Sequence, residues 1–329
     1  MQAARLFGIG DLRLHKVEIP APGPGDVLIK VETAGICGTD RHLFKGEFPC
    51  TPPVTLGHEF SGIIVGLGDG ADLPIGARVA CDPNISCGVC AHCRRGRVNL
   101  CPANIAIGIH RDGGFAEYAV LPAHRAHVLP ADLNPLHGAF CEPLACTLHG
   151  MDTGAAVPGD RVMILGGGVI GMLAVQLARL AGAEVMLVTR QSAKRDLALS
   201  LGANTVAQDV HHAKRLWPQG AELVVECAGV GATIAAAPHL ARTGGRVVIL
   251  GVLAQGETVA FEPFDLLFRE IQLHHAFLNP FTQSRAVAMI AAGRIVVDPL
   301  ISRVISLSDA PDVIANAPRP GEVKVLIVP

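Results

Sequence analysis

Residues 161–171 read RVMILGGGVIG, and this stretch decides the fold of the second half of the chain. An apolar strand candidate, Val162–Leu165, leads into three glycines and then into a helix candidate without breakers, Val169–Leu180. In this context G-x-G-x-x-G is typical of a dinucleotide-binding turn, where glycines let the backbone approach a pyrophosphate at a helix N-terminus. The alternative is an ordinary glycine-rich connection. The residues predicted to hold the dinucleotide here are Gly166, Gly168, Val169, Ile170 and Gly171.

The alternation of strand and helix candidates continues along the chain. The further segments are Glu184–Val188 (strand), Ser192–Leu201 (helix), Leu223–Cys227 (strand) and Arg246–Leu250 (strand). Alternating strands and helices predict an α/β fold with a doubly wound parallel sheet. The first 150 residues differ, because short β-like runs are separated by Gly- and Pro-rich turns, which predicts a β-rich domain. These runs are Val27–Glu32, Ser61–Gly66 and Ala77–Cys81.

The end of the second strand bears on cofactor choice. A site that prefers NAD usually has Asp or Glu there to hold the ribose hydroxyls, whereas this chain reads Val188-Thr189-Arg190-Gln191-Ser192. Arg190 can pair with a 2′-phosphate, so the sequence predicts that NADP is preferred over NAD. Thr189, Ser192 and Arg195 are predicted to add hydrogen bonds. The alternative is that Arg190 is a solvated surface charge.

Four of the ten cysteines fall within one short stretch, as Cys87, Cys90, Cys93 and Cys101. Two-residue spacings let consecutive sulfurs turn onto one ion, and four thiolates complete a tetrahedral zinc site that has no open position. Such a site is structural. The alternatives are an iron–sulfur cluster, which also uses four cysteines, and a set of free thiols.

A second group of metal-ligating residue types is dispersed along the chain. It comprises Cys37, His58, Glu59 and Glu142. Each has an ordinary structural interpretation alone, because a lone buried cysteine is usually a small hydrophobe. Together, cysteine, histidine and carboxylate can form a catalytic zinc site that keeps one position for substrate. Spacing does not show that these residues converge.

The motifs together carry a resemblance that covers essentially the whole chain. They are GICGTD at Gly35–Asp40, Gly57-His58-Glu59, the four-cysteine loop, Glu142-Pro143-Leu144, Gly166–Gly171 and Glu226-Cys227-Ala228-Gly229. The chain resembles the zinc-containing medium-chain dehydrogenase/reductase family, in its polyol and threonine dehydrogenase branch. The resemblance implies a GroES-like catalytic domain at 1–145 with a structural-zinc loop at about 85–103. A Rossmann domain at 146–280 and a C-terminal segment, 281–329, that returns to the first domain would follow.

The resemblance also implies residue roles. Cys37, His58 and a glutamate, either Glu59 or Glu142, would hold the catalytic zinc, which makes two zinc ions per subunit. Thr39 and His42 would pass the alcohol proton toward solvent, since a hydroxyl can relay a proton and histidine changes charge near neutral pH. The implied cofactor contacts also include Cys227, Gly251 and Phe277.

These features predict a dehydrogenase that oxidises a secondary hydroxyl of a polyol, sugar or vicinal diol to the ketone. One alternative is a dehydrogenase of a hydroxy amino acid such as L-threonine. Another is an NADP-binding protein without turnover. Sorbitol-type relatives carry an arginine–aromatic pair where this chain reads Phe277-Leu278-Asn279-Pro280, and the missing arginine argues against sorbitol as the substrate.

Composition limits the partners. The 329-residue chain has a net charge of −2 and only 17% charged residues, which argues against binding to nucleic acid or an anionic membrane. We find no apolar run near the roughly 20 residues needed to span a bilayer and no signal-peptide pattern, so the cytoplasm is expected. The resemblance implies a homo-oligomer, either a tetramer or a dimer.

Overall fold

The computed structural model describes residues 1–329, and the chain divides into two compact units. The first unit contains Met1–Ala145, Asn279–Arg319 and Lys324–Pro329. The second contains Cys146–Leu278 and Pro320–Val323. The chain therefore leaves the first unit after Ala145 to build most of the second, returns at Asn279, and leaves it again only for the short segment Pro320–Val323. The predicted α/β class is confirmed, since one unit is rich in antiparallel strands and the other is a parallel sheet with helices.

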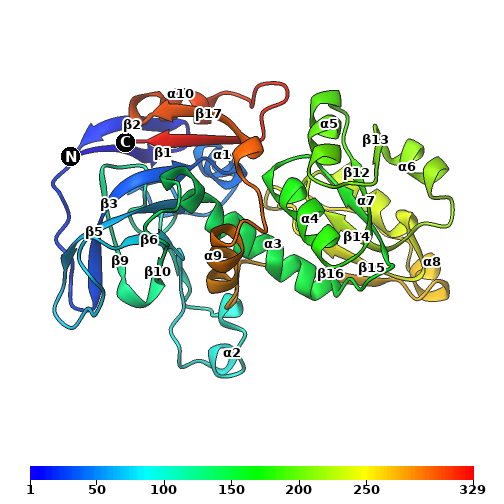
Figure 1. Ribbon diagram of the computed structural model, residues 1–329, viewed down its shortest axis with the longest axis horizontal. Helices are drawn as coiled ribbons and strands as arrows, with labels where there is room; N and C mark the ends of the chain where they lie inside the picture. Colours follow the sequence, from blue (N-terminus) through cyan, green and yellow to red (C-terminus); the bar gives the residue numbers. More distant parts are fainter. The chain divides into compact units, whose positions relative to one another are not determined.

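The second unit is a six-stranded parallel sheet in the order β13-β12-β11-β14-β15-β16. Its strands are β11 (Arg161–Leu165), β12 (Glu184–Val188), β13 (Thr205–Ala207), β14 (Ala221–Glu226), β15 (Ala241–Ile249) and β16 (Gln272–His275). Its helices are α4 (Val169–Leu180), α5 (Ser192–Ser200), α6 (Val210–Leu216), α7 (Gly231–Leu240) and α8 (Pro263–Phe268). Helices α4, α5, α6 and α7 pack against the sheet (Figure 1). The strand order reverses between β11 and β14, which is where this fold binds dinucleotides.

The predicted segments of this unit agree with the structure to within a few residues, except at the sheet edges. The two outermost strands, β13 and β16, lie outside the prediction because they are short and carry polar residues. The central strands are predictable because both faces are buried, which makes them continuous apolar runs. The helix predicted at Ser192–Leu201 is also present, ending at Ser200.

The first unit is built on a seven-stranded sheet in the order β10-β6-β5-β3-β18-β17, with β9 also paired to β3. These strands are β3 (Asp26–Gly35), β5 (Glu59–Leu67), β6 (Arg78–Cys81), β9 (Tyr118–Pro122), β10 (Ala126–Val128), β17 (Ile301–Ser306) and β18 (Lys324–Val328). Two small sheets accompany it: β2-β1-β4 and β7-β8. Their strands are β1 (Gln2–Gly8), β2 (Asp11–Lys16), β4 (Val54–Thr55), β7 (Asn84–Ile85) and β8 (Ile105–Ala106). Both termini lie in this unit (Figure 1).

The helices of the first unit connect and cover these sheets. They are α1 (Gly38–Lys45), α2 (Ala91–Arg94), α9 (Gln283–Ala291) and α10 (Ala310–Ala315), and α3 (Cys141–Gly154) leads into the second unit. The core beneath them is apolar and includes the fully buried Phe60 and Phe115. None of the helices combines the length and the apolar character required to cross a bilayer.

Candidate active site

Three of the dispersed residues meet in the first unit. Cys37 is the N-cap of α1, directly after β3, while His58 and Glu59 stand at the beginning of the neighbouring strand β5. One ligand atom from each of the three lies within 4.8 Å of the others. His58 and Glu59 are buried, and Cys37 is half-buried. The set of one thiol, one imidazole and one carboxylate matches catalytic zinc sites, which use three protein ligands.

Asp40 stands behind this set. It is fully buried, and its Oδ2 accepts a hydrogen bond of 2.8 Å from the backbone N–H of Cys37. Its Oδ1 lies 3.6 Å from Nδ1 of His58, and neither atom has a hydrogen-bond partner. Burial raises the pKa of Asp40 to about 6, against the opposing charge of His58. A carboxylate beside the second nitrogen of a ligating histidine is the usual outer partner of a zinc site.

The electrostatics of this cluster favour a bound cation. Burial alone would lower the pKa of His58, but the negative charges of Cys37, Asp40 and Glu142 raise it well above its ordinary value. The site therefore attracts positive charge, which a proton on His58 supplies in the metal-free state. Glu142, in the first turn of α3, is buried and its charge acts on His58, but it is not one of the three residues whose ligand atoms converge.

Lys324 is a further member of the cluster, and the sequence analysis does not identify it. This lysine begins β18, is 1% exposed, and forms an ion pair with the Glu59 carboxylate. Its Nζ also donates a 3.1 Å hydrogen bond to the carbonyl of Ile36. Burial opposes its charge, but Glu59, Cys37 and Asp40 together outweigh burial and raise the pKa of Lys324. Gly35 leaves space for this ion pair, because a Cβ at that position would lie 2.5 Å from Oε2 of Glu59.

The two residues of the predicted proton path lie on α1. Thr39 and His42 are three residues apart, so they share one face of the helix. The Thr39 hydroxyl is 3.6 Å from the Cys37 sulfur, next to the metal ligands. His42 is nearer the surface, with 30% of its side chain exposed. The predicted path would thus lead from the half-buried Thr39, beside the Cys37 sulfur, to the partly exposed His42.

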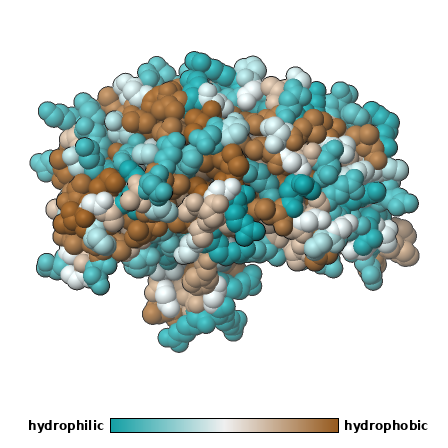
Figure 2. Space-filling model, in the orientation of Figure 1, coloured by the Kyte–Doolittle hydropathy of each residue, from teal (hydrophilic) through white to brown (hydrophobic).

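The four predicted structural ligands also converge. The sulfurs of Cys87, Cys90, Cys93 and Cys101 all lie within 4.8 Å of one another. Backbone N–H groups point at them; that of Cys87, for example, donates to the Cys101 sulfur at 3.4 Å. Such bonds from Val89 and Cys90 lower the pKa of Cys87 to about 6, which favours the thiolate. The lobe that carries α2 has a hydrophilic tip (Figure 2).

The glycine turn of the second unit is shaped for a phosphate. Gly168 is the N-cap of α4, whose first N–H groups have no partner within the helix. Gly171 packs against the turn so closely that a Cβ would lie 1.9 Å from the Gly166 carbonyl oxygen. Val169 and Ile170 form the first turn of the helix. This geometry leaves the helix N-terminus available to an anion.

At the end of β12 the predicted residues take different positions. Arg190 and Ser192 are exposed, and Thr189 is half-buried beside the glycine turn. Arg195 instead braces the loop, because its Nη1 donates to the carbonyls of Thr189 (2.9 Å) and Arg190 (2.8 Å). A cation that the sequence analysis does not identify, Lys194, lies beside the turn. A Cβ on Gly167 would be 3.3 Å from the Cβ of Lys194.

The remaining predicted cofactor residues follow β14 and β15. Cys227 directly follows the buried Glu226, which accepts hydrogen bonds from the backbone N–H of Ala228 (2.9 Å) and the Thr233 hydroxyl (2.7 Å). Gly251 fits against Glu226, since a Cβ there would lie 2.3 Å from its Oε2. Glu226 thus organises the loops that end two strands. Phe277 is half exposed.

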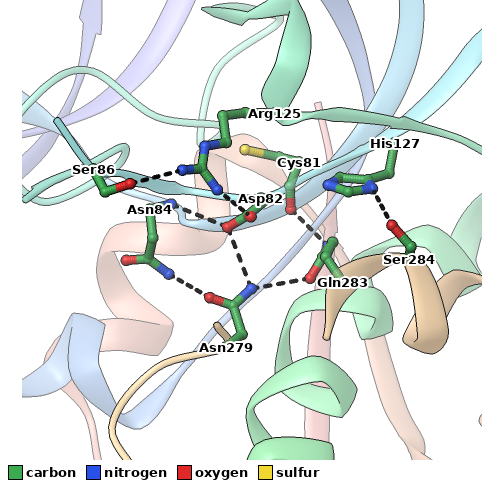
Figure 3. Close-up of polar contacts among 9 residues, drawn as sticks. All are labelled: Cys81, Asp82, Asn84, Ser86, Arg125, His127, Asn279, Gln283 and Ser284. Carbon is green, nitrogen blue, oxygen red and sulfur yellow. Dashed lines mark hydrogen bonds and ion pairs between the residues drawn. The ribbon is translucent and has the colours of Figure 1, made fainter. Parts of the chain in front are cut away.

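Asn279 belongs to the stretch Phe277–Pro280, and its side chain is engaged within the protein. It is 3% exposed, and its Oδ1 accepts a 2.7 Å hydrogen bond from Nδ2 of Asn84. Its own Nδ2 donates to Asp82 (3.3 Å) and Gln283 (3.2 Å), and Arg125 closes the network on Asp82 at 2.8 Å (Figure 3). All of its hydrogen-bonding groups are directed into the protein.

Comparison with known proteins agrees with this arrangement. Residues 23–131 match the alcohol dehydrogenase GroES-like domain, and residues 169–292 match the zinc-binding dehydrogenase family. The chain belongs to the zinc-containing medium-chain alcohol dehydrogenase superfamily. It is accordingly an oxidoreductase of a family that combines zinc with a nicotinamide cofactor.

Relatives within the superfamily include several polyol dehydrogenases. The chain is 32% identical to D-arabinitol dehydrogenase 1 of Uromyces fabae over 91% of its own length and 88% of the relative. It is also 32% identical to L-threonine 3-dehydrogenase of Thermococcus kodakarensis, over 88% of the chain and 86% of the relative. A zinc-binding dehydrogenase of Sinorhizobium meliloti bound to NADP superimposes with a TM-score of 0.97 at 55% identity, covering 100% and 99% of the two chains.

Proposed function

We propose that this dehydrogenase oxidises a secondary hydroxyl of a polyol, sugar or vicinal diol to the ketone and prefers NADP to NAD. The convergence of Cys37, His58 and Glu59 in a buried set supports it most directly. A protein that only bound NADP would have no use for three metal-ligating residue types at such close range. The four-cysteine lobe would hold a second, structural zinc ion.

The chemistry follows from the groups around the set. When bound, Zn²⁺ would supply a Lewis acid that lowers the pKa of the substrate hydroxyl. Glu59, whose carboxylate lies with Cys37 and His58, would provide the carboxylate ligand, with Glu142 as the alternative. Lys324 forms an ion pair with Glu59. Thr39 takes the hydroxyl proton and His42 delivers it to water. When bound, the nicotinamide cofactor would supply the acceptor for the hydride that the carbinol carbon loses.

The cofactor preference rests on charge at the end of β12. Arg190 is exposed and stands where a carboxylate would favour NAD, and Lys194 adds a second cation beside the glycine turn. The S. meliloti relative, whose structure contains NADP, supports the same preference. Arg195 would act indirectly, by fixing the backbone of Thr189 and Arg190.

The substrate class rests on the relatives and on Asn279. Asn279 lies in the stretch where sorbitol-type relatives carry an arginine, and its side chain is bonded within the first unit, which argues against sorbitol as the substrate. A hydroxy amino acid is the second candidate, because L-threonine 3-dehydrogenases are among the relatives. Such a substrate requires separate groups for its carboxylate and its amine.

The test is reduced-cofactor absorbance with zinc-loaded protein and a panel of pentitols, hexitols, 2,3-butanediol and L-threonine, each with NAD and with NADP. We expect turnover with a polyol or diol and NADP, and loss of turnover in Cys37→Ala. Turnover with L-threonine alone would replace the substrate class. Turnover with NAD alone would refute the cofactor preference.

A further inference from the structure

The turn that ends α1 brings a carboxylate back onto the helix. Gly46 adopts a left-handed conformation with φ 74°, and its N–H donates to the Leu43 carbonyl at 3.1 Å. The next N–H, that of Glu47, donates to the His42 carbonyl at 2.8 Å. This pair of bonds is the Schellman arrangement, for which a glycine is best suited. A Cβ on Gly46 would also lie 2.5 Å from the side chain of Ile9, so packing fixes the turn as well.

The turn places the Glu47 side chain against the ring of His42. Oε2 of Glu47 lies 2.7 Å from Nδ1 of His42. An ionised carboxylate can only accept a hydrogen bond, so Nδ1 carries the hydrogen. The neutral ring then has its free lone pair on Nε2, because the hydrogen bond at one nitrogen decides the role of the other. Both side chains are about one-third exposed, which gives water access to the ring.

We propose that Glu47 is a positioning residue for the proton path, and this inference rests on the proposed function. Glu47 holds His42 in the Nδ1–H form, so that Nε2 receives the hydroxyl proton by way of Thr39 and then releases it to water. No proton is gained or lost over the cycle at His42, and Glu47 stays ionised.

The contact between Glu47 and His42 is expected to contribute little to the stability of the fold. Ion pairs between partly exposed side chains contribute little to stability. The exposed Lys45 is close in sequence to Glu47, yet the carboxylate contacts the histidine. In the Ser-His-Asp hydrolases the same pairing of carboxylate and Nδ1–H selects the tautomer of the catalytic histidine. Removal of Glu47 should therefore leave the fold intact and change the state of the ring.

The first test is spectroscopic and does not require a known substrate. Long-range ¹H–¹⁵N spectra of zinc-loaded, ¹⁵N-histidine-labelled protein report which ring nitrogen carries the hydrogen, and His42→Gln identifies the resonance. We expect neutral His42 as the Nδ1–H form in the native protein and loss of that preference in Glu47→Met. The control Glu18→Met alters an exposed glutamate and should keep the native spectrum. An Nε2–H ring in the native protein, or an unchanged ring in Glu47→Met, would overturn the proposal.

The second test separates this proposal from the proposed function. With an alcohol that turns over, Glu47→Met should lower kcat on the order of tenfold, a fraction of what a general base contributes, and change KM less than twofold. Glu47→Gln keeps an acceptor and should recover most of the rate. In the His42→Gln background, Glu47→Met should have no further effect. A normal kcat in Glu47→Met beside a low kcat in His42→Gln would overturn the role of Glu47 alone. Normal kcat in both would overturn the proton path and, with it, this role.

Discussion

Replacing Asp40 by Asn should stabilise the metal-free protein and weaken zinc binding. Asp40 is fully buried, and burial raises its pKa from 3.8 to about 6. A raised carboxyl pKa means that the folded state prefers the protonated form. The stability that the protonated Asp40 contributes to the fold is fully present below pH 3.8, the ordinary pKa of the group, and is lost as the pH rises through about 6. At about 1.4 kcal/mol per pH unit, the loss is about 3 kcal/mol at neutral pH.

Asn at position 40 cannot ionise, so the variant does not lose this free energy of unfolding at neutral pH, and it preserves the local geometry. Its side-chain oxygen can still accept the 2.8 Å hydrogen bond from the Cys37 N–H that caps α1. We expect metal-free Asp40→Asn to gain up to about 3 kcal/mol at pH 7 and only about 0.5 kcal/mol at pH 4. Zinc affinity should fall about 10- to 100-fold, because the histidine ligand loses its charged outer partner.

Urea unfolding of metal-free protein at pH 4 and pH 7 measures the first effect, and competition with a chromogenic chelator measures the second. Asp72→Asn is the matched control, because Asp72 is exposed. Its free energy of unfolding and its zinc affinity should equal those of the native protein. A metal-free Asp40→Asn protein that is less stable than the native protein at pH 7 would refute the reasoning. Unchanged zinc affinity would refute the role of Asp40 behind His58.

Three further predictions concern the cofactor turn and the lobe. Arg190→Asp should lower kcat/KM for NADP relative to NAD by tenfold or more, since it reverses the charge at the expected 2′-phosphate position; unchanged selectivity would contradict this. Gly171→Ala should cost about 1–3 kcal/mol in urea unfolding, because its Cβ would lie 1.9 Å from the Gly166 carbonyl oxygen. Gly168→Ala is the control, with open space at its Cβ, and equal losses in the two variants would exclude the steric explanation. Cys93→Ala should reduce bound zinc from two ions to one by elemental analysis and lower Tm, whereas two retained ions would contradict a four-cysteine site.

Much of the fold is predictable because its determinants are local. The run from Val162 to Gly171 contains both the buried strand and the turn, and the structure reproduces it. The four cysteines are similarly close in sequence, and their sulfurs do converge. Edge strands such as β13 lack this signal, because a short strand at a sheet edge needs neither an apolar run nor strict alternation.

The outer parts of the site depend on contacts that sequence spacing cannot show. Lys324 and Glu59 are 265 residues apart in the sequence but form an ion pair in the fold. The sequence also gives no indication that this charged side chain is buried. Arg195 is a cation near the predicted phosphate position, but only the structure shows that its guanidinium is bonded to backbone carbonyls. The sequence near Glu47 does indicate its contact with His42: the helix that contains His42 ends at a glycine, and the glutamate follows that glycine directly. Recognising it requires the Schellman geometry.

The pairing of β18 has a consequence for biosynthesis. This strand lies between β3 and β17, so the sheet that buries the metal ligands lacks an inner strand until residues 324–328 have been translated. Cys37 and His58 are translated long before their lysine neighbour. Contacts between such distant segments slow folding, because a long loop must close before they form. A nascent chain that captures a metal ion early would do so with an unfinished site, so completion of the catalytic centre is expected to wait until β18 has joined the sheet.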